Sequence, residues 1–207
     1  MGGVPKRVDH EVRRRQIAEA VWRIAASRGL PAATLREVAV EAGVSMRLVQ
    51  YYFETKEQLL VSAFQQLTAA FGERMRERFA ELGRAPGPRD VMGICLAAVL
   101  PADERSLMMS RVQSAYFAAS LTDPAIAAAA GAAGTPPPTA LENLLAAQIE
   151  LAVAAGDVPA GVDAMLEARG LAALGAGLAS MVVAGLRTPA EAAETVEYRL
   201  GELFRSR

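Results

Sequence analysis

The sequence predicts an all-α fold of about nine helices, and two observations support this prediction. Hydrophobic residues make up 52% of the chain, whereas aromatic residues make up only 5%. Such a composition, rich in Ala and Leu, favours helices over sheets, and no segment alternates with the period of a strand. The 207 residues are enough for a small domain followed by a larger one. We therefore expect an amino-terminal domain over residues 1–56 and a larger helical domain over residues 57–207.

The first helix is expected over residues 9–28. Ile17, Val21 and Ile24 recur at helical spacing, so they share one face of that helix. Gly29 follows directly, and a glycine at this place commonly ends a helix. We interpret the apolar face as the side that packs into the core of the amino-terminal domain.

A second and a third helix follow closely. Thr34 and Glu37 have the spacing of a capping box, in which two side chains satisfy free backbone donors at a helix start. Gly43 supplies a tight turn, and Ser45 is the expected N-cap of the third helix. A helix, a glycine turn and a second short helix are the plan of a helix-turn-helix, whose second helix enters the major groove of DNA.

Beyond this motif the same kinds of signal predict six more helices. Capping-box patterns at Thr55 and Thr188 open the first and the last of them. Pro101 separates two others, and a run rich in Gly and Pro at residues 131–138 interrupts a further one. The predicted helices span residues 55–82, 89–100, 103–121, 123–155, 162–186 and 188–204.

The charges are distributed unevenly along the chain. Residues 1–56 hold 10 Lys and Arg against 6 Asp and Glu, whereas residues 57–207 hold 12 against 17. A basic amino-terminal segment on an acidic remainder is typical of a DNA-binding module carried by a soluble body. Three consecutive arginines at residues 13–15 oppose the helix dipole, which hints at a role near DNA, but we interpret them as solvated. We also interpret His10 as solvated.

The third helix has two distinct faces when successive residues are placed about 100° apart. One face carries Met46, Arg47, Gln50 and Tyr51. The opposite face carries Leu48, Val49 and Tyr52, which we expect to pack on the first two helices. Arg pairs well with a guanine edge, Gln with an adenine edge, and Met can contact a thymine methyl group. The alternative is that the polar face is only a solvated surface.

Residues that flank this helix are placed to contact phosphates. Thr34 and Arg36 lie at the start of the second helix, where free backbone amides already favour an anion. Lys56 lies at the start of the fourth helix, on the far side of the third. Such contacts fix the register on DNA and add affinity that depends on salt. The predicted DNA-binding residues are Thr34, Arg36, Ser45, Met46, Arg47, Gln50, Tyr51, Tyr52 and Lys56.

The segment AGVSMRLVQYYFETKEQLL, residues 42–60, resembles the signature of the TetR family of transcriptional regulators. The matching residues are Ala42, Gly43, Val44, Ser45, Tyr52, Phe53, Thr55, Lys56, Glu57 and Leu59. Two groove-facing positions depart from the family pattern: Arg47, where the family often has a small residue, and Gln50, where it commonly has Tyr or His. Base reading by these two residues therefore rests on their chemistry and not on the resemblance.

The resemblance implies that the carboxy-terminal body binds a small ligand. The helix over residues 103–121 agrees, because it is apolar nearly all round with a few polar groups, as a ligand pocket requires. Scarce aromatic residues argue against a cage for quaternary ammonium ligands. For each candidate the alternative is an ordinary core position. The predicted ligand-binding residues are Phe71, Cys95, Leu96, Val99, Met109, Gln113, Tyr116 and Gln148.

The resemblance also implies a homodimer formed by the last two helices. No charged residue lies between Arg169 and Arg187, but this stretch is short and rich in Gly and Ala, so we expect a buried helix and not a membrane span. The alternative is that this helix is the centre of a single bundle. The predicted interface residues are Leu171, Leu174, Leu178, Met181, Val182, Val196, Leu200 and Leu203.

The rest of the composition argues against catalysis. The chain has one His and one Cys, so it offers no metal-ligand cluster, and we expect no metal and no cofactor. A single Cys and the absence of a secretory signal indicate the cytoplasm. We expect a ligand-responsive repressor that binds a palindromic operator on double-stranded DNA as a homodimer, without a membrane. The alternatives are a regulator controlled by a protein partner, an activator, or an all-α enzyme.

Overall fold

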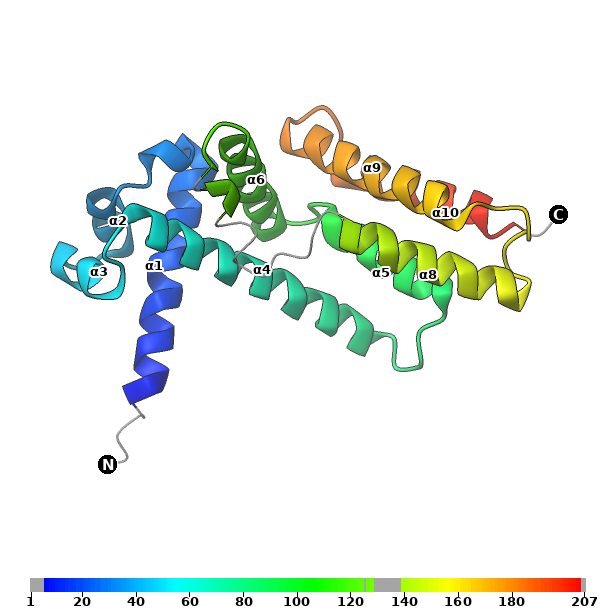
Figure 1. Ribbon diagram of the computed structural model, residues 1–207, viewed down its shortest axis with the longest axis horizontal. Coiled ribbons are helices and arrows are strands. Elements are labelled where there is room, and N and C mark those ends of the chain that lie inside the picture. The colour runs from blue at the N-terminus through cyan, green and yellow to red at the C-terminus, as the bar shows by residue number, and fades with distance from the viewer. Residues whose placement is uncertain (1–5, 125, 129–138, 206–207) are drawn as a thin grey trace. The chain divides into compact units, whose positions relative to one another are not determined.

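The computed structural model describes residues 6–124, 126–128 and 139–205 of the chain (Figure 1). No residue in these three ranges is in a strand, which confirms the predicted all-α fold. The elements are α1 (Lys6–Arg28), the 3₁₀ helix η1 (Leu30–Ala32), α2 (Leu35–Ala42), α3 (Met46–Tyr52), α4 (Lys56–Glu81), α5 (Pro88–Val99), α6 (Glu104–Ser120), α8 (Thr139–Ala155), α9 (Ala164–Val183) and α10 (Pro189–Leu203). The predicted break at residues 131–138 lies outside the described residues.

The chain forms two compact units. The first comprises Met1–Ala70 and Arg111–Thr135, and the second comprises Phe71–Ser110 and Pro136–Arg207. The division therefore falls inside α4 and inside α6. This division reflects how the helices pack. The predicted boundary after residue 56 instead separates the expected DNA-binding domain from the larger helical domain, and it stays a prediction.

The core of the first unit confirms the apolar face predicted for the first helix. Ile17, Val21 and Ile24 are all buried, and α1 ends before Gly29, whose φ of 79° suits a residue without a side chain. α1 extends to Lys6, so it begins three residues earlier than the predicted start at residue 9. The buried face of α1 packs against α2, which orders the helix-turn-helix.

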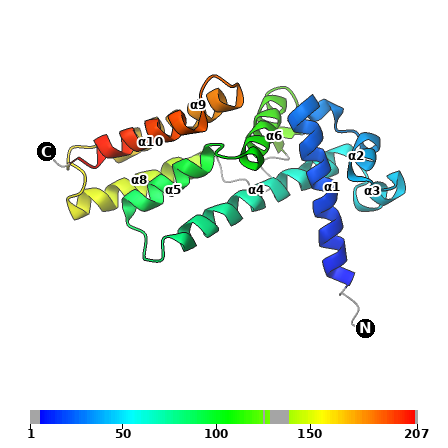
Figure 2. The same cartoon turned by 180° about the vertical axis from the view of Figure 1, so that it is seen from behind.

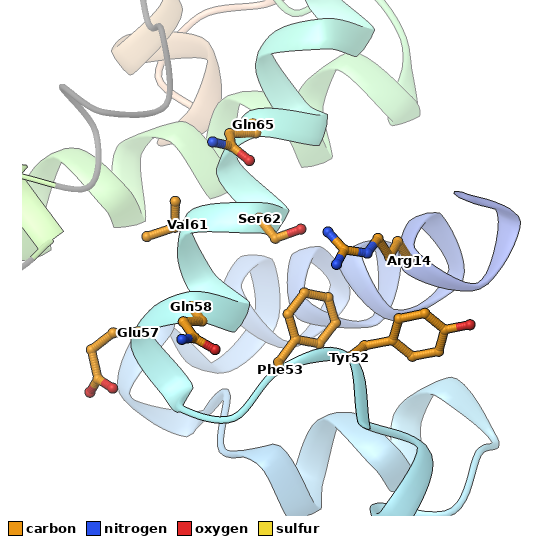
Figure 3. A pocket seen from close by; sticks show the side chains of 8 residues that line it. All are labelled: Arg14, Tyr52, Phe53, Glu57, Gln58, Val61, Ser62 and Gln65. Carbon is orange, nitrogen blue, oxygen red and sulfur yellow. The ribbon is translucent and has the colours of Figure 1, made fainter. Parts of the chain in front are cut away.

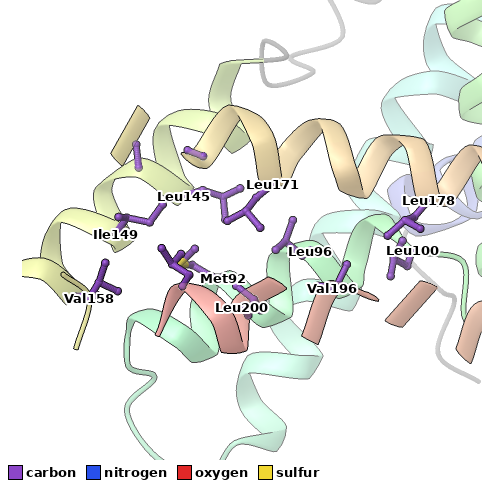
Figure 4. Close-up of a cluster of buried hydrophobic side chains, with 14 of the residues drawn as sticks. Met92, Leu96, Leu100, Leu145, Ile149, Val158, Leu171, Leu178, Val196 and Leu200 are labelled. Carbon is purple, nitrogen blue, oxygen red and sulfur yellow. The ribbon is translucent and has the colours of Figure 1, made fainter. Parts of the chain in front are cut away.

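The second unit is a bundle of α5, α8, α9 and α10. In Figure 2, α8 lies beside α5 and α10 lies beside α9, and the same pairs are in contact. One cluster of buried side chains fills the space between the four helices (Figure 4). Its centre contains Met92 and Leu96 of α5, Ile149 of α8, Leu171 of α9 and Leu200 of α10. Each helix thus contributes one apolar stripe to a shared core.

Capping explains where several helices begin. At the start of α10, Glu191 N–H donates to the Thr188 hydroxyl oxygen, and the Glu191 carboxylate accepts from Thr188 N–H. These hydrogen bonds from Thr188 lower the pKa of the Glu191 carboxyl. The capping box predicted at Thr34 is only half formed: Glu37 N–H donates to the Thr34 hydroxyl, but the Glu37 carboxylate pairs with Arg28 at 2.9 Å. The Glu37 carboxylate therefore pairs with Arg28 of α1 and does not cap the start of α2.

Candidate nucleic-acid interface

The reading helix α3 has seven residues and is held at both ends. Gly43, with a φ of 65°, ends α2 in the left-handed conformation that glycine adopts without strain. The Ser45 hydroxyl accepts a hydrogen bond of 3.2 Å from Leu48 N–H, which is the predicted N-cap. At the other end Phe53 is buried, and its N–H donates to the Val49 carbonyl. A helix this short depends on such anchors because it has few internal hydrogen bonds.

The exposure of α3 agrees with the two faces predicted from its sequence. Val49 is buried, and Leu48 and Tyr52 are half-buried. Met46, Arg47 and Gln50 are exposed, and Tyr51 is 71% exposed. The face that carries hydrogen-bonding groups is therefore free to meet a partner, whereas contact of these groups with DNA stays a prediction.

The arginines of the helix-turn-helix region divide into two groups. Arg15, Arg23 and Arg28 form ion pairs with Glu19, Glu41 and Glu37, and Arg13 donates to the Gln16 amide oxygen at 2.9 Å. Over residues 10–56, which the structure describes in full, Arg14, Arg36 and Arg47 have no ion pair with a carboxylate. A guanidinium without a carboxylate keeps its hydrogen-bond donors available for phosphates or bases. Two of these three arginines, Arg36 and Arg47, belong to the predicted DNA-binding set.

Two of the predicted phosphate-binding residues already have structural roles. The Lys56 ammonium donates a hydrogen bond of 3.1 Å to the Pro31 carbonyl, which ties α4 to η1. The Thr34 hydroxyl caps α2 by accepting from Glu37 N–H. Lys56 keeps two further N–H donors and Thr34 keeps its O–H donor, so each can still contact a phosphate.

An aromatic cluster joins α1 to α3, and sequence analysis missed it. The His10 ring lies edge-on to the Tyr52 ring at 5.5 Å between centroids, and Tyr52 lies edge-on to Tyr51 at 5.3 Å. The Arg14 guanidinium lies over the rings of Tyr52, at 6.0 Å, and Phe53, at 5.7 Å. His10 and Arg14 are four residues apart, so their shared helix face was visible in the sequence. That this face meets α3 is decided only by the tertiary packing.

A groove with a volume of about 390 Å³ lies beside this cluster (Figure 3). α1 contributes Arg14, the end of α3 contributes Tyr52 and Phe53, and the first turns of α4 contribute the remaining wall. The residues from α4 are Glu57, Gln58, Val61, Ser62 and Gln65. In Figure 3 the Arg14 side chain lies at the opposite end of the groove from Glu57. The groove therefore has a cationic end and an anionic end.

The predicted ligand-binding residues are distributed over both units. Gln113 and Tyr116 belong to the first unit, where Gln113 is exposed and the Tyr116 hydroxyl donates to the Leu60 carbonyl at 2.7 Å. Cys95, Leu96 and Met109 are buried in the second unit. Half-buried positions of that unit hold the remaining three, Phe71, Val99 and Gln148. Leu96 belongs to the four-helix core, so for this residue the structure favours the core alternative. Binding by the others stays a prediction.

Cys95 has an environment that suppresses thiol chemistry. Its side chain is 2% exposed, and burial raises the pKa of the thiol to about 11 because a thiolate loses its hydration there. A thiol in this state is a poor nucleophile and a poor metal ligand near neutral pH. Among the residues that the structure describes, no group of three or more His, Cys, Asp or Glu side chains is arranged to hold a metal ion.

The residues predicted at the dimer interface lie mostly in the core of the single chain. Six of the eight residues are buried within the single chain and belong to its four-helix core: Leu171, Leu178, Val182, Val196, Leu200 and Leu203. Such side chains have little surface left for a partner, whereas Leu174 is half-buried and Met181 is 43% exposed. Periodicity identifies the apolar stripes but does not distinguish a core from an interface, so the interface itself stays a prediction.

The exposed side of α9 is instead lined by small and apolar residues. They recur every three or four positions and are Leu166, Gly170, Ala173, Gly177 and Met181. By length and composition α9 could cross a membrane, with a mean hydropathy of 1.4, and 28% of its apolar window is buried in the chain. Because most of this apolar stretch of α9 is not buried within the chain, its surface is suited to close contact with another protein.

Comparison with known proteins is consistent with this geometry. Residues 17–63 match the family described as "Bacterial regulatory proteins, tetR family". The HTH-type transcriptional regulator PksA of Bacillus subtilis is 34% identical over 116 residues, which cover 56% of this chain and 55% of PksA. The chain therefore matches about half the length of this curated relative. The matched residues contain the whole helix-turn-helix, from the apolar face of α1 to the first turns of α4.

Solved structures resemble the chain over nearly its whole length. A transcriptional regulator from Rhodococcus sp. Rha1 has a TM-score of 0.73 and 25% identity, covering 92% of this chain and 95% of that one. A transcriptional regulator from Saccharomonospora viridis, solved in complex with choline, has a TM-score of 0.80 and 23% identity. It covers 95% of this chain and 100% of that one. The second likeness is one of fold alone.

Proposed function

We propose that the chain is a transcriptional regulator of the TetR family, which residues 17–63 match, and that it represses transcription as a homodimer on a palindromic operator. A small molecule that binds the carboxy-terminal body would release it from the DNA. The observation that carries the proposal is the exposed face of α3. Its polar side chains are free while Val49 and Phe53 anchor the helix from below.

On this proposal α3 lies in the major groove, and its exposed side chains read base edges. Arg47 has no carboxylate partner over residues 10–56, so both edges of its guanidinium remain available for a guanine. Gln50 is exposed one turn away and suits an adenine. Arg36, at the first turn of α2, would contact a phosphate, so its contribution would not depend on the base sequence.

The test is selection of bound duplexes from a random pool, followed by affinity measurements on the selected sequence. We expect the Arg47→Ala variant to lose the preference at one base position and about 1–3 kcal/mol of binding free energy. The Arg36→Ala variant is the matched control, and it should weaken binding to all sequences equally. A wild-type chain that enriches no sequence, or an Arg47→Ala variant with unchanged preference, would contradict base reading by α3.

A homodimer is supported by the exposed stripe of α9 described above. Gly170, Ala173 and Gly177 would let the same helix of a second copy approach closely, and Leu166 and Met181 would extend the apolar contact. A two-fold dimer of this kind presents two reading helices to two half-sites of the operator. α9 would then be covered by protein and not by lipid, which agrees with a regulator that acts in the cytoplasm.

Release by a ligand requires that the ligand bind one conformation of the dimer more tightly than the other. The half-buried Phe71, Val99 and Gln148 and the buried Met109 remain our candidates for contacts in the second unit. The Saccharomonospora viridis protein was solved with choline, but aromatic residues form only 5% of this chain, which disfavours the same ligand here. A ligand found by thermal-shift screening should lower operator affinity; ligands that bind without this effect would favour control by a protein partner, or an activator.

We also propose that the chain acts by binding and not by catalysis. The thiol of Cys95 is buried with a raised pKa, and the ring of His10 packs against Tyr52. Neither group is arranged as an activated nucleophile or as a general base with a substrate site. An enzymatic activity that disappears in a Cys95→Ala variant would contradict this proposal.

A further inference from the structure

We propose that Arg14 and the groove beside it hold a phosphate group of the DNA backbone next to the carboxy-terminal end of α3. The proposal rests on the DNA-binding function proposed above. Sequence analysis interpreted the three arginines at residues 13–15 as one solvated run. The structure separates them, because Arg14 alone of the three lies in a groove that α3 also lines.

The first support is that Arg14 lacks the partners its neighbours have. Arg15 pairs with Glu19 at 3.5 Å, and Arg13 donates to Gln16 at 2.9 Å. Over residues 10–56 no carboxylate lies within ion-pair distance of Arg14. It shares this state with Arg36 and Arg47, the two arginines that sequence analysis placed at the DNA. Over residues 10–56, Arg14, Arg36 and Arg47 are thus the arginines with neither an ion pair nor a hydrogen bond to another side chain.

The second support is that the Arg14 guanidinium is held in place. It lies over the Phe53 ring at 5.7 Å and the Tyr52 ring at 6.0 Å. A guanidinium has five N–H donors, so an arginine that lies over aromatic rings still has donors for an anion. A donor fork that is already oriented loses little conformational entropy when it binds an oxyanion.

The third support is the character of the groove around Arg14. Figure 3 shows the Ser62 hydroxyl on the side of the groove that faces Arg14, with Glu57 directed away at the other end. In the part of α4 that lies in the same unit, the Thr68 hydroxyl donates to the Phe64 carbonyl at 3.2 Å. Ser62 makes no such bond to its own helix within the described residues, so its hydroxyl is available to a ligand. The cationic end of the groove is thus rich in free donors and suits an anion.

The position of the groove favours DNA as the source of that anion. Tyr52 is the last residue of α3 and also lines the groove, so the groove lies at the carboxy-terminal end of the reading helix. When a recognition helix lies in the major groove, its ends approach the sugar–phosphate strands on either side. A volume of about 390 Å³ is ample for a phosphate and part of its sugar. Arg14 would then contribute register and salt-dependent affinity, without reading a base.

The experiment compares the Arg14→Gln and Arg15→Gln variants, which lose the same charge from adjacent positions of one helix. Affinity for a duplex of about 20 base pairs is measured by fluorescence anisotropy between about 50 and 200 mM KCl. For Arg14→Gln we expect the slope of log affinity against log salt to fall by about 0.9 per subunit. Across this salt range, the fold-loss of affinity per subunit would therefore be about 3.5 times smaller for Arg14→Gln than for the wild type. Arg15→Gln should keep the wild-type slope.

The Arg14→Lys variant separates a phosphate contact from a merely structural role. It keeps the charge, so it should keep most of the slope, whereas a role in packing α1 on α3 would lower its melting temperature and that of Arg14→Gln together. Equal slopes for Arg14→Gln and Arg15→Gln, with a wild type that binds duplex in a salt-dependent way, would overturn the assignment of Arg14 alone. A wild type that binds no duplex at low salt would overturn the DNA-binding function as well.

Discussion

The indole N–H of Trp22 in α1 donates a hydrogen bond of 3.0 Å to the carbonyl oxygen of Ala63 in α4, and both residues are buried. About one turn earlier in α4 the Tyr116 hydroxyl of α6 donates to the Leu60 carbonyl at 2.7 Å. Two side chains from different helices thus bind carbonyls one turn apart on α4. These two hydrogen bonds hold the first half of α4, which follows the reading helix closely in the chain, against α1 and α6.

Replacing Trp22 by Phe should destabilise the first unit. The variant loses the hydrogen bond to Ala63 and leaves part of the indole volume empty, so we expect the free energy of unfolding to fall by about 1–3 kcal/mol. Thermal unfolding followed by circular dichroism measures the effect. Tyr198→Phe is the control, because Tyr198 is 61% exposed and its hydroxyl is solvated. Similar melting temperatures for the two variants would show that the Trp22 contact contributes little.

Two substitutions of Ser45 should separate helix capping from DNA binding. Ser45→Ala removes the acceptor for Leu48 N–H and should cost about 0.5–2 kcal/mol of stability. Ser45→Asp keeps a good N-cap, so its melting temperature should match the wild type, but it places a negative charge at the proposed DNA surface. We therefore expect weaker duplex binding from a stably folded Ser45→Asp protein. Wild-type affinity in this variant would remove Ser45 from the interface.

The Ala173→Arg variant should abolish dimerisation without unfolding the chain. Ala173 is exposed on α9 between Gly170 and Gly177, so an arginine there fits the single chain but would place a charge in the proposed interface. Light scattering after size-exclusion chromatography should give a mass near 21.8 kDa for the variant and twice that for the wild type. Val40→Arg, at a position 76% exposed on α2, should remain dimeric. A wild type with the mass of one chain would contradict the dimer itself.

The stability of the protein should fall as the pH rises from 9.0 to about 11, because of Cys95. Burial raises the pKa of this thiol from 9.0 to about 11, so the unfolded chain ionises first and is favoured in that window. Below pH 9 the thiol is neutral in both states and the stability is fully present. Urea unfolding at several pH values should show the difference between wild type and Cys95→Ala changing across this window.

The comparison with Cys95→Ala is necessary because burial also raises the pKa of Tyr116, which weakens the folded state in the same direction at high pH. Tyr116 is present in both proteins, so its contribution cancels in the difference. A parallel decline of the two proteins between pH 9 and 11 would show that Cys95 is solvated in the folded state. Fast modification of the native thiol at pH 8 by an aromatic disulfide reagent would lead to the same conclusion.

Local signals in the sequence were sufficient for the helix-turn-helix. Gly43, Ser45 and Val49 each have the conformation, the cap or the burial that their residue type and spacing predicted. These features depend on hydrogen bonds and torsions within a few residues, so neighbouring residues carry the information. The capping box at Thr34 was predicted only in part. Arg28 belongs to α1, outside the capping pattern of α2, and it binds the Glu37 carboxylate that the pattern assigned to the helix start.

The sequence by itself determined the helices, their caps and which side of each helix is apolar, because these follow from backbone geometry and from a period of about 3.6 residues. Only the tertiary structure decided what each face meets. It placed Leu171 and Leu200 in the chain's own core and left Ala173 on the surface. It also placed Arg14 against Tyr52 while the adjacent Arg15 pairs with Glu19. Periodicity specifies a direction around a helix, whereas the neighbour in that direction comes from a distant part of the chain.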